Sequence, residues 1–214
     1  METLNVPTRT HGRVLLREAA RPSLVLIGFH GYMENATIQM DRLVGISGSE
    51  RWNLVSVQGL HRFYRGRSEE VVASWMTRQD REIMIGDNIE YANEVLDRVS
   101  IRGVPVVTLG FSQGTAMAFR AAVRARRAIA GVVAVGGDVP PELFADAYAV
   151  FPPLLIVRGE RDDWYTADKA RNDVGSLRAR SVEPEVTVHP GGHEWTMAVS
   201  DAAASFLARL ALGS

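Results

Sequence analysis

The chain of 214 residues lacks cysteine, and Lys169 is its only lysine. The absence of cysteine excludes disulfide bonds, a cysteine nucleophile and thiolate metal sites. The net charge is −1 and no basic tract occurs, so no part of the chain has the electrostatic pattern of a nucleic-acid or anionic-membrane surface. No apolar run reaches membrane length, and the first residues lack a signal-peptide pattern. We therefore expect a cytoplasmic protein with no membrane span and no nucleic-acid partner.

The sequence does contain short apolar runs that alternate with helical patterns. Strands are predicted at residues 13–16, 24–29, 54–57, 104–109, 129–135, 154–157 and 186–188, and helices at 35–46, 81–99, 112–127, 167–179 and 194–212. Most of the strand runs are continuously apolar, which is typical of strands buried on both faces of a parallel sheet. The alternation predicts one domain over residues 1–214, a three-layer α/β fold with a mostly parallel central sheet, helices on both faces and no large lid.

One pentapeptide carries the strongest chemical signal. Residues 110–114 read Gly-Phe-Ser-Gln-Gly, after a predicted strand and before a predicted helix, which is the context of a nucleophile elbow at Ser112. A serine hydroxyl is a weak nucleophile and must be held within reach of a base. Gly110 and Gly114 lack the β-carbons that would crowd such a turn. The alternative, an ordinary glycine-rich turn with an incidental serine, is disfavoured by this context.

A serine nucleophile requires a base, for which the chain offers five histidines. His193 lies in a glycine-rich loop between the last predicted strand and the last predicted helix, and we expect it to be the base. His189, at the end of that strand, is its rival. His11 and His61 fall in polar segments, where surface roles are expected.

The acid that orients the base should follow another strand. Asp162 and Asp163 follow the run 154–157, and the chain order Ser, Asp, His fits this architecture. Glu160 in the same loop and Asp138 after the preceding strand are weaker candidates. The aspartate pair also has the pattern of a helix N-cap with an acidic first turn.

An oxyanion hole completes such a site, because backbone N–H groups must stabilise the charge that develops on the substrate oxygen. One donor is expected to be the N–H of Gln113, directly after the serine. The other is expected to be the N–H of Tyr32, in the loop that follows residues 24–29. There we expect Gly31 to permit a sharp turn.

With these pieces placed, the chain resembles the phospholipase/carboxylesterase branch of the α/β-hydrolase superfamily, which includes acyl-protein thioesterase-like enzymes. The resemblance rests on Phe29-His30-Gly31, Gly110-Phe-Ser-Gln-Gly114, Gly159-x-x-Asp162 and Gly192-His193-Glu194. It implies an α/β-hydrolase fold and a carboxylesterase-type activity. It also selects Asp162 as the acid, because the acid in this family is the third residue after the loop glycine.

Several aromatic residues lie close in sequence to the predicted site. An apolar substrate pocket is expected to include Tyr32, Phe63, Tyr64 and Trp164. Residues 59–74 form the longest stretch without a helix or strand pattern. Their arginines indicate either a solvated basic loop or a flap over the site.

The sequence thus predicts a serine hydrolase that cleaves carboxylic esters or thioesters of small to medium acyl groups. Ser112, His193 and Asp162 would form the catalytic triad, and the mechanism needs no metal and no organic cofactor. The expected partner is a small-molecule ester or thioester. A peptidase or amidase on the same fold is one alternative, and a ligand-binding protein without activity is another.

Overall fold

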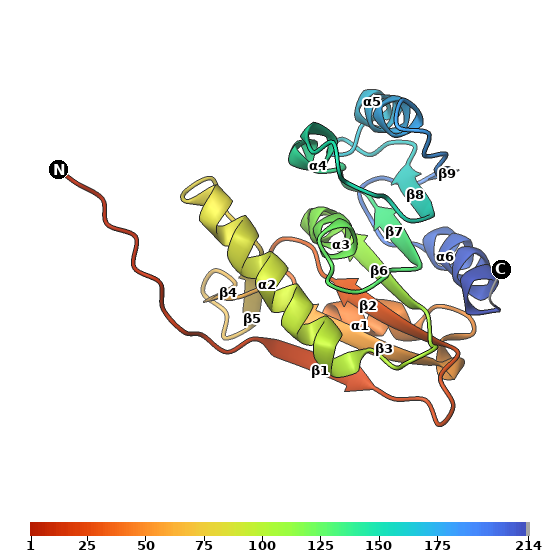
Figure 1. Cartoon of the computed structure of the whole chain (residues 1–214), viewed down its shortest axis with the longest axis horizontal. Coiled ribbons are helices and arrows are strands. Elements are labelled where there is room, and N and C mark those ends of the chain that lie inside the picture. The colour runs from red at the N-terminus through yellow and green to blue at the C-terminus, as the bar shows by residue number, and fades with distance from the viewer. Residues whose placement is uncertain (213–214) are drawn as a thin grey trace.

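The structure is a computed structural model that describes residues 1–212. Strands and helices alternate along most of the chain (Figure 1). The strands are β1 (Arg13–Arg17), β2 (Leu24–Phe29), β3 (Trp52–Gln58), β4 (His61–Tyr64), β5 (Val71–Ser74), β6 (Val106–Phe111), β7 (Gly131–Val135), β8 (Leu154–Gly159) and β9 (Glu185–His189). The helices are α1 (Ala36–Val44), η1 (Ser49–Arg51), α2 (Arg81–Val99), α3 (Gln113–Val123), α4 (Pro141–Ala145), α5 (Ala167–Arg178) and α6 (Met197–Ala211).

The central sheet has the order β1-β3-β2-β6-β7-β8-β9. Every neighbouring pair is parallel except β1 and β3, which are antiparallel. The mostly parallel sheet expected from the continuous apolar runs is therefore confirmed, with the short N-terminal strand as an antiparallel edge.

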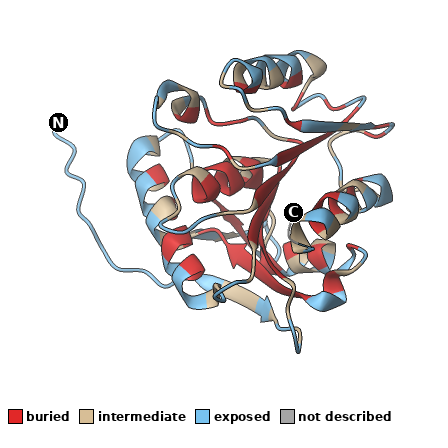
Figure 2. Cartoon of the chain, turned by 45° about the vertical axis from the view of Figure 1, so that its right-hand side comes forward, coloured by how far each residue is buried: buried red, intermediate tan, exposed pale blue. Residues whose placement is uncertain are grey.

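Helices cover both faces of this sheet because successive strand residues point to opposite sides. In β2, Val25 and Ile27 pack in one cluster with residues of α2, α3, α4 and α5. Leu24 and Leu26 pack in a second cluster with residues of α1 and α6. Figure 2 shows the buried strands between the two helical layers. This confirms the expected three-layer arrangement.

The parallel strands place the candidate chemistry at one edge of the sheet. The carboxyl ends of parallel strands lie together, and binding sites of open α/β sheets form beyond them. The loops that follow β2, β6, β8 and β9 carry Tyr32, Ser112, Asp162 and His193, respectively. Residues from four distant parts of the sequence can therefore meet there.

Several elements differ from the sequence prediction. Residues 59–74, expected to be irregular, contain the antiparallel hairpin β4–β5. Helix α4 was not predicted. The helix expected over 112–127 ends at Val123, where the side chain of Asn93 bonds to the carbonyl of Arg124 and the N–H of Arg126 and so holds the chain out of the helix.

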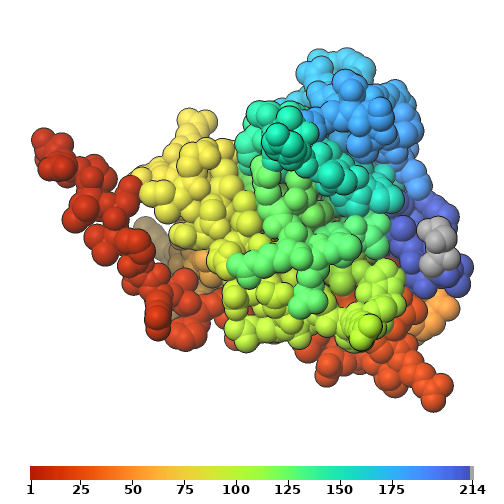
Figure 3. Space-filling model, in the orientation of Figure 1, coloured from red at the N-terminus to blue at the C-terminus, as the bar shows by residue number. Residues whose placement is uncertain are grey.

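The N-terminal residues 1–12 are exposed and form no helix or strand. They extend away from the rest of the molecule (Figures 1 and 3). Across residues 1–212, none of the helices combines the length and the apolar character needed to cross a membrane.

Candidate active site

Ser112 occupies a strained turn between β6 and α3. Its backbone has φ 53° and ψ −120°, a region that non-glycine residues rarely adopt. A serine at a helix N-cap usually bonds to the first turn, but Ser112 makes no such bond. Neighbouring glycines make the turn possible, since a β-carbon on Gly110 would lie 2.2 Å from the carbonyl oxygen of Gly114.

The hydroxyl of Ser112 instead meets His193. Its Oγ lies 2.8 Å from His193 Nε2, and His193 Nδ1 lies 2.9 Å from Asp162 Oδ2. An ionised carboxylate only accepts hydrogen bonds, so Nδ1 carries the ring hydrogen and Nε2 is left to accept from the serine. The structure thus brings together all three residues that the sequence predicted as a triad.

The surroundings of Asp162 keep its carboxylate charged. Burial raises the pKa of this carboxyl, but hydrogen bonds from the Tyr165 N–H, from His193 and from the Trp164 N–H outweigh it, so the pKa lies below the usual value. The two backbone donors lie 2.8 Å from Asp162 Oδ1. They fix the carboxylate while Oδ2 faces the imidazole.

The rival residues have other partners, although Asp138 lines the same cavity as Ser112 and His193. His189 is buried and its Nδ1 accepts the N–H of Gly191. The carboxylate of Asp138 pairs with Lys169. Asp163 is exposed, and the expectation that the aspartate pair caps the next helix is wrong, because Thr166 is the N-cap of α5.

Tyr32 and Gln113, whose backbone N–H groups are expected to form an oxyanion hole, line the same cavity as Ser112. Neither the N–H of Tyr32 nor that of Gln113 donates a hydrogen bond to another residue within 1–212. The expected reason for Gly31 needs correction, because Met33 is the residue with positive φ, 58°. Space around Gly31 is tight, because its β-carbon would lie 3.0 Å from a Glu34 carboxylate oxygen.

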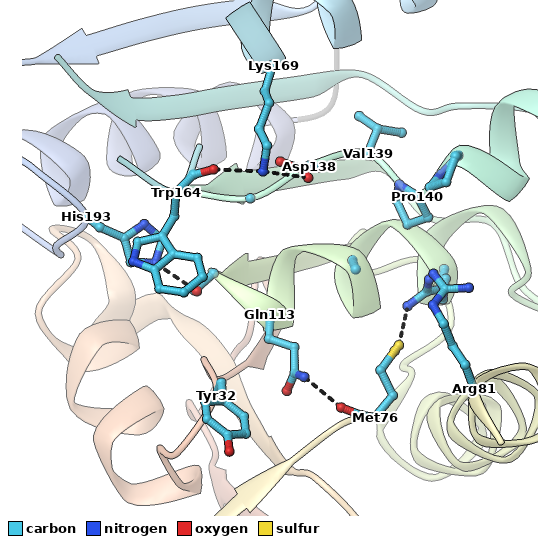
Figure 4. A pocket seen from close by; sticks show the side chains of 16 residues that line it. Tyr32, Met76, Arg81, Gln113, Asp138, Val139, Pro140, Trp164, Lys169 and His193 are labelled. Carbon is cyan, nitrogen blue, oxygen red and sulfur yellow. Dashed lines mark hydrogen bonds and ion pairs between the residues drawn. The ribbon is translucent and has the colours of Figure 1, made fainter. Parts of the chain in front are cut away.

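A cavity of about 610 Å³ opens beside Ser112 and His193. Figure 4 shows Tyr32 and Trp164 around its mouth, with Gln113 between them and Arg81 farther away. Two of the four aromatic residues expected in the pocket, Tyr32 and Trp164, are therefore in the lining. Phe63 and Tyr64 are not, because strand β4 holds them in the hairpin, where Phe63 packs on the ring of Tyr32.

The family model described as serine hydrolase (FSH1) matches residues 24–195. The chain belongs to the FSH1 serine hydrolase family. The match spans every residue of the hydrogen-bonded Ser112–His193–Asp162 array. No curated protein matches the sequence of this FSH1 hydrolase.

Solved structures show which fold the FSH1 hydrolase shares. It is similar to Zea mays acyl-protein thioesterase 2, with a TM-score of 0.74, 15% identity and coverage of 94% of this chain and 100% of the other. For esterase PE8 the TM-score is 0.71 at 19% identity, with coverage of 93% of this chain and 98% of the other. For the Bacillus cereus carboxylesterase the TM-score is 0.69 at 16% identity, with coverage of 93% of this chain and 94% of the other. At these identities the likeness shows a common α/β-hydrolase fold.

Contacts behind the site hold the loop that carries Gly31 and Tyr32 in this FSH1 hydrolase. Glu34 accepts the N–H of Gly31 at 2.8 Å and both ends of the Arg42 guanidinium at 2.6 Å. The guanidinium lies 4.1 Å over the ring of Phe111, the residue before the serine. One bidentate ion pair therefore ties the Tyr32 loop to the elbow.

Gln113 forms a second tie through its side chain. Its Oε1 accepts the N–H of Trp75 at 2.9 Å, and its Nε2 donates to the carbonyl of Met76 at 3.0 Å. These bonds fix the first residue of α3 to the end of β5. The backbone N–H of Gln113 is thereby held at the cavity.

Sequence reasoning missed several residues of the cavity wall. They come from the start of α2, from α3 and from the loop before α4, and are Met76, Arg81, Ala116, Arg120, Val139 and Pro140. One signal was available. Ala116 and Arg120 follow Gln113 at helical spacing, which places all three on one face of α3.

Proposed function

We propose that this hydrolase cleaves carboxylic esters or thioesters of small to medium acyl groups through an acyl-enzyme intermediate. The observation that carries the proposal is the continuous hydrogen-bonded chain from Ser112 Oγ through His193 to Asp162, which opens on a cavity. This order of nucleophile, base and acid is the arrangement that activates a serine.

Acylation begins when Ser112 attacks the carbonyl carbon of the ester and His193 Nε2 takes the hydroxyl proton. Asp162 stabilises the imidazolium that forms, since its carboxylate is held ionised beside Nδ1. The N–H groups of Tyr32 and Gln113 donate to the developing oxyanion. His193 then returns the proton to the departing alcohol or thiol. Water repeats the sequence and releases the acid.

The cavity supports the substrate class. Its walls near Ser112 are formed largely by apolar side chains and glycine backbone, including Ala116, Val139, Pro140 and Gly137. Pockets of this kind suit small apolar groups held by a few polar contacts. A volume of about 610 Å³ accommodates a small to medium acyl group.

A fluorophosphonate probe and a chain-length series of p-nitrophenyl esters and acyl thioesters test the proposal. We expect covalent labelling at Ser112 and hydrolysis of the shorter members. Ser112→Ala should remove labelling and lower kcat by about 10⁴–10⁶ while the protein stays folded. Ester hydrolysis at wild-type rate by the purified variant would refute the role of Ser112. Absence of labelling in the wild-type protein would favour a binding protein instead.

A further inference from the structure

The cavity follows one face of helix α3 away from the nucleophile. Gln113, Ala116 and Arg120 lie one helical turn apart in succession, and all three line the cavity together with Ser112. At 1.5 Å per residue, the Cα of Arg120 lies about 12 Å along the helix from that of Ser112. Long helical side chains lean toward the helix N-terminus, so the guanidinium points back toward the serine.

Arg120 is a buried cation, and one of its N–H groups has only a weak hydrogen-bond acceptor among the described residues. Only 1% of its side chain is exposed. Its Nε donates to Oε1 of Glu142 at 2.7 Å and its Nη2 lies 2.6 Å from the same oxygen, whereas Nη1 donates to the thioether sulfur of Met76, at 3.5 Å. A thioether is a weak acceptor, and a buried N–H with no better partner is costly. Nη1 would therefore gain from a stronger acceptor, which must displace the Met76 sulfur to reach this buried side chain.

A second arginine stands at the same end of the cavity. Arg81, at the start of α2, lies across the cavity from His193 in Figure 4. It lies 3.7 Å from Oε2 of Glu142, beyond hydrogen-bonding distance, and contacts Glu82, which is largely exposed to solvent. Both arginines line the cavity and Glu142 does not. The carboxylate thus stands behind two cations that face the cavity.

The rest of the wall sets the shape of a ligand that would reach this end. Between Ser112 and Arg120 the lining includes Ala116, Met76 and Val139, none of which carries charge. The ammonium of Lys169 is already engaged by the carboxylate of Asp138 and the carbonyl of Trp164. An apolar strip therefore runs from Ser112 toward the two arginines, and the Asp138–Lys169 ion pair also lines the cavity.

We propose that the preferred substrate is an ester or thioester whose remote end carries a carboxylate, bound by Arg120 and Arg81 while its apolar chain lies along α3. This inference rests on the proposed function. A carboxylate would give Arg120 Nη1 a strong acceptor and would meet two guanidinium groups. The chemistry is the same whether the carboxylate belongs to the acyl group or to the alcohol.

Matched substrates test the inference. On the acyl side, the p-nitrophenyl hemiesters of glutaric, adipic and suberic acids are compared with the p-nitrophenyl esters of pentanoic, hexanoic and octanoic acids. On the alcohol side, acetate esters of ω-hydroxy acids are compared with acetates of the matching alkanols by pH-stat titration. In one of these two arms we expect kcat/KM to favour the carboxylate by about tenfold or more, the effect of one hydrogen bond to a charged group.

Three variants identify the cause of that preference. Arg81→Gln should reduce it, and the double variant Arg120→Met with Glu142→Gln should abolish it without leaving Glu142 as an unpaired carboxylate. The readout is the ratio of kcat/KM for each carboxylate ester to that for its matched neutral ester, so any change in neutral-ester hydrolysis in these variants does not enter the preference. Arg98→Gln, in the last turn of α2 and paired with Glu94 at the surface, is the control and should keep the full preference.

Two failures are distinguishable. If Ser112-dependent hydrolysis of neutral esters is found but neither arm prefers the carboxylate, or the double variant keeps the preference, the inference is wrong and the proposed function stands. If the wild-type protein shows no Ser112-dependent hydrolysis of any ester in either arm, the proposed function fails and the inference falls with it.

Discussion

At the scale of single residues, both carboxylate oxygens of Asp162 have hydrogen-bond partners. Oδ1 accepts the backbone N–H groups of Trp164 and Tyr165 and lies 3.1 Å from His193 Nδ1, whereas Oδ2 lies 2.9 Å from Nδ1. In Asp162→Asn, an amide can keep the first pair of bonds, but its NH₂ group then faces Nδ1 and favours the wrong imidazole tautomer. We expect kcat for ester hydrolysis to fall by about 10⁴, with the melting temperature little changed.

The adjacent aspartate provides the control. Asp163 is exposed and caps no helix, so Asp163→Asn should leave kcat near wild type and change the free energy of unfolding by no more than about 0.5 kcal/mol. An inactive Asp163→Asn protein beside an active Asp162→Asn protein would place the acid one residue later.

A second residue-scale prediction concerns His30, which is fully buried. Burial lowers its pKa, against raising contributions from the Gly31 carbonyl and Glu34. Its Nε2 accepts the N–H of Gly59 at 3.0 Å, so the ring is held neutral. The unfolded state binds the proton first, near pH 6.5. The free energy of unfolding should therefore fall as pH drops below about 6.5, by at most about 1.4 kcal/mol per unit, until the folded-state pKa is reached.

Urea titrations between pH 5 and 8 measure this slope. His30→Gln should reduce the slope, whatever its effect on absolute stability. His61→Gln, which replaces an exposed histidine of β4, is the matched control and should retain the wild-type slope. Equal slopes in the wild-type and His30→Gln proteins would show that His30 does not titrate differently on unfolding.

At the scale of elements, the close contact between α3 and β2 depends on one glycine. A β-carbon on Gly114 would lie 2.1 Å from the carbonyl oxygen of Phe29 and 2.6 Å from that of His30. Gly114→Ala must therefore displace α3 or the loop that follows β2. We expect it to lower the free energy of unfolding by about 3 kcal/mol or more and to abolish esterase activity.

Gly175 gives the opposite expectation by the same measurement. It lies within α5, and a β-carbon there would meet no atom within 4 Å. Gly175→Ala should raise the free energy of unfolding by roughly 0.5–1 kcal/mol, because alanine loses less backbone entropy in a helix. A destabilised Gly175→Ala protein would contradict this reading of α5.

Periodicity located the long elements and failed on the short ones. The apolar run 24–29 and the apolar stripe over 81–99 have the same bounds as β2 and α2. All of β2 and one face of α2 are buried, so apolar residues mark both elements in the sequence. Strand β4 is largely exposed and pairs only with β5, so no alternation of apolar residues marks it. Helix α4 has five residues, too few to show a helical period.

Some residues of the candidate site could be predicted from the sequence and others could not. Ser112 and His193 could be predicted because glycines lie at short spacing beside them, whereas Asp162 was separated from Asp163 only by the resemblance to a known family. The cationic end of the cavity could not, since Arg120 and Glu142 are 22 residues apart and no local pattern links them. Phe63 was placed in the pocket on sequence proximity, whereas the hairpin directs it to the ring of Tyr32.

At the scale of the whole molecule, the members of the proposed triad follow strands at different positions in the sheet, from the centre to the edge. Ser112 follows β6, which has β2 and β7 on its two sides. His193 follows β9, an edge strand that pairs only with β8 and leaves Val186 and Val188 about half exposed. The base is therefore carried by a less protected part of the molecule than the nucleophile.

This difference in protection affects how the protein loses activity. Edge elements with few buried contacts open at lower free energy than the centre of a sheet. Fraying of β9 would withdraw the imidazole while β2, β6 and β7 stay folded. Activity should then disappear at lower urea than the helical circular dichroism signal, and β9 amides should exchange with deuterium before those of β6. The working lifetime of the catalyst would be governed by this partial opening, long before the fold as a whole gives way.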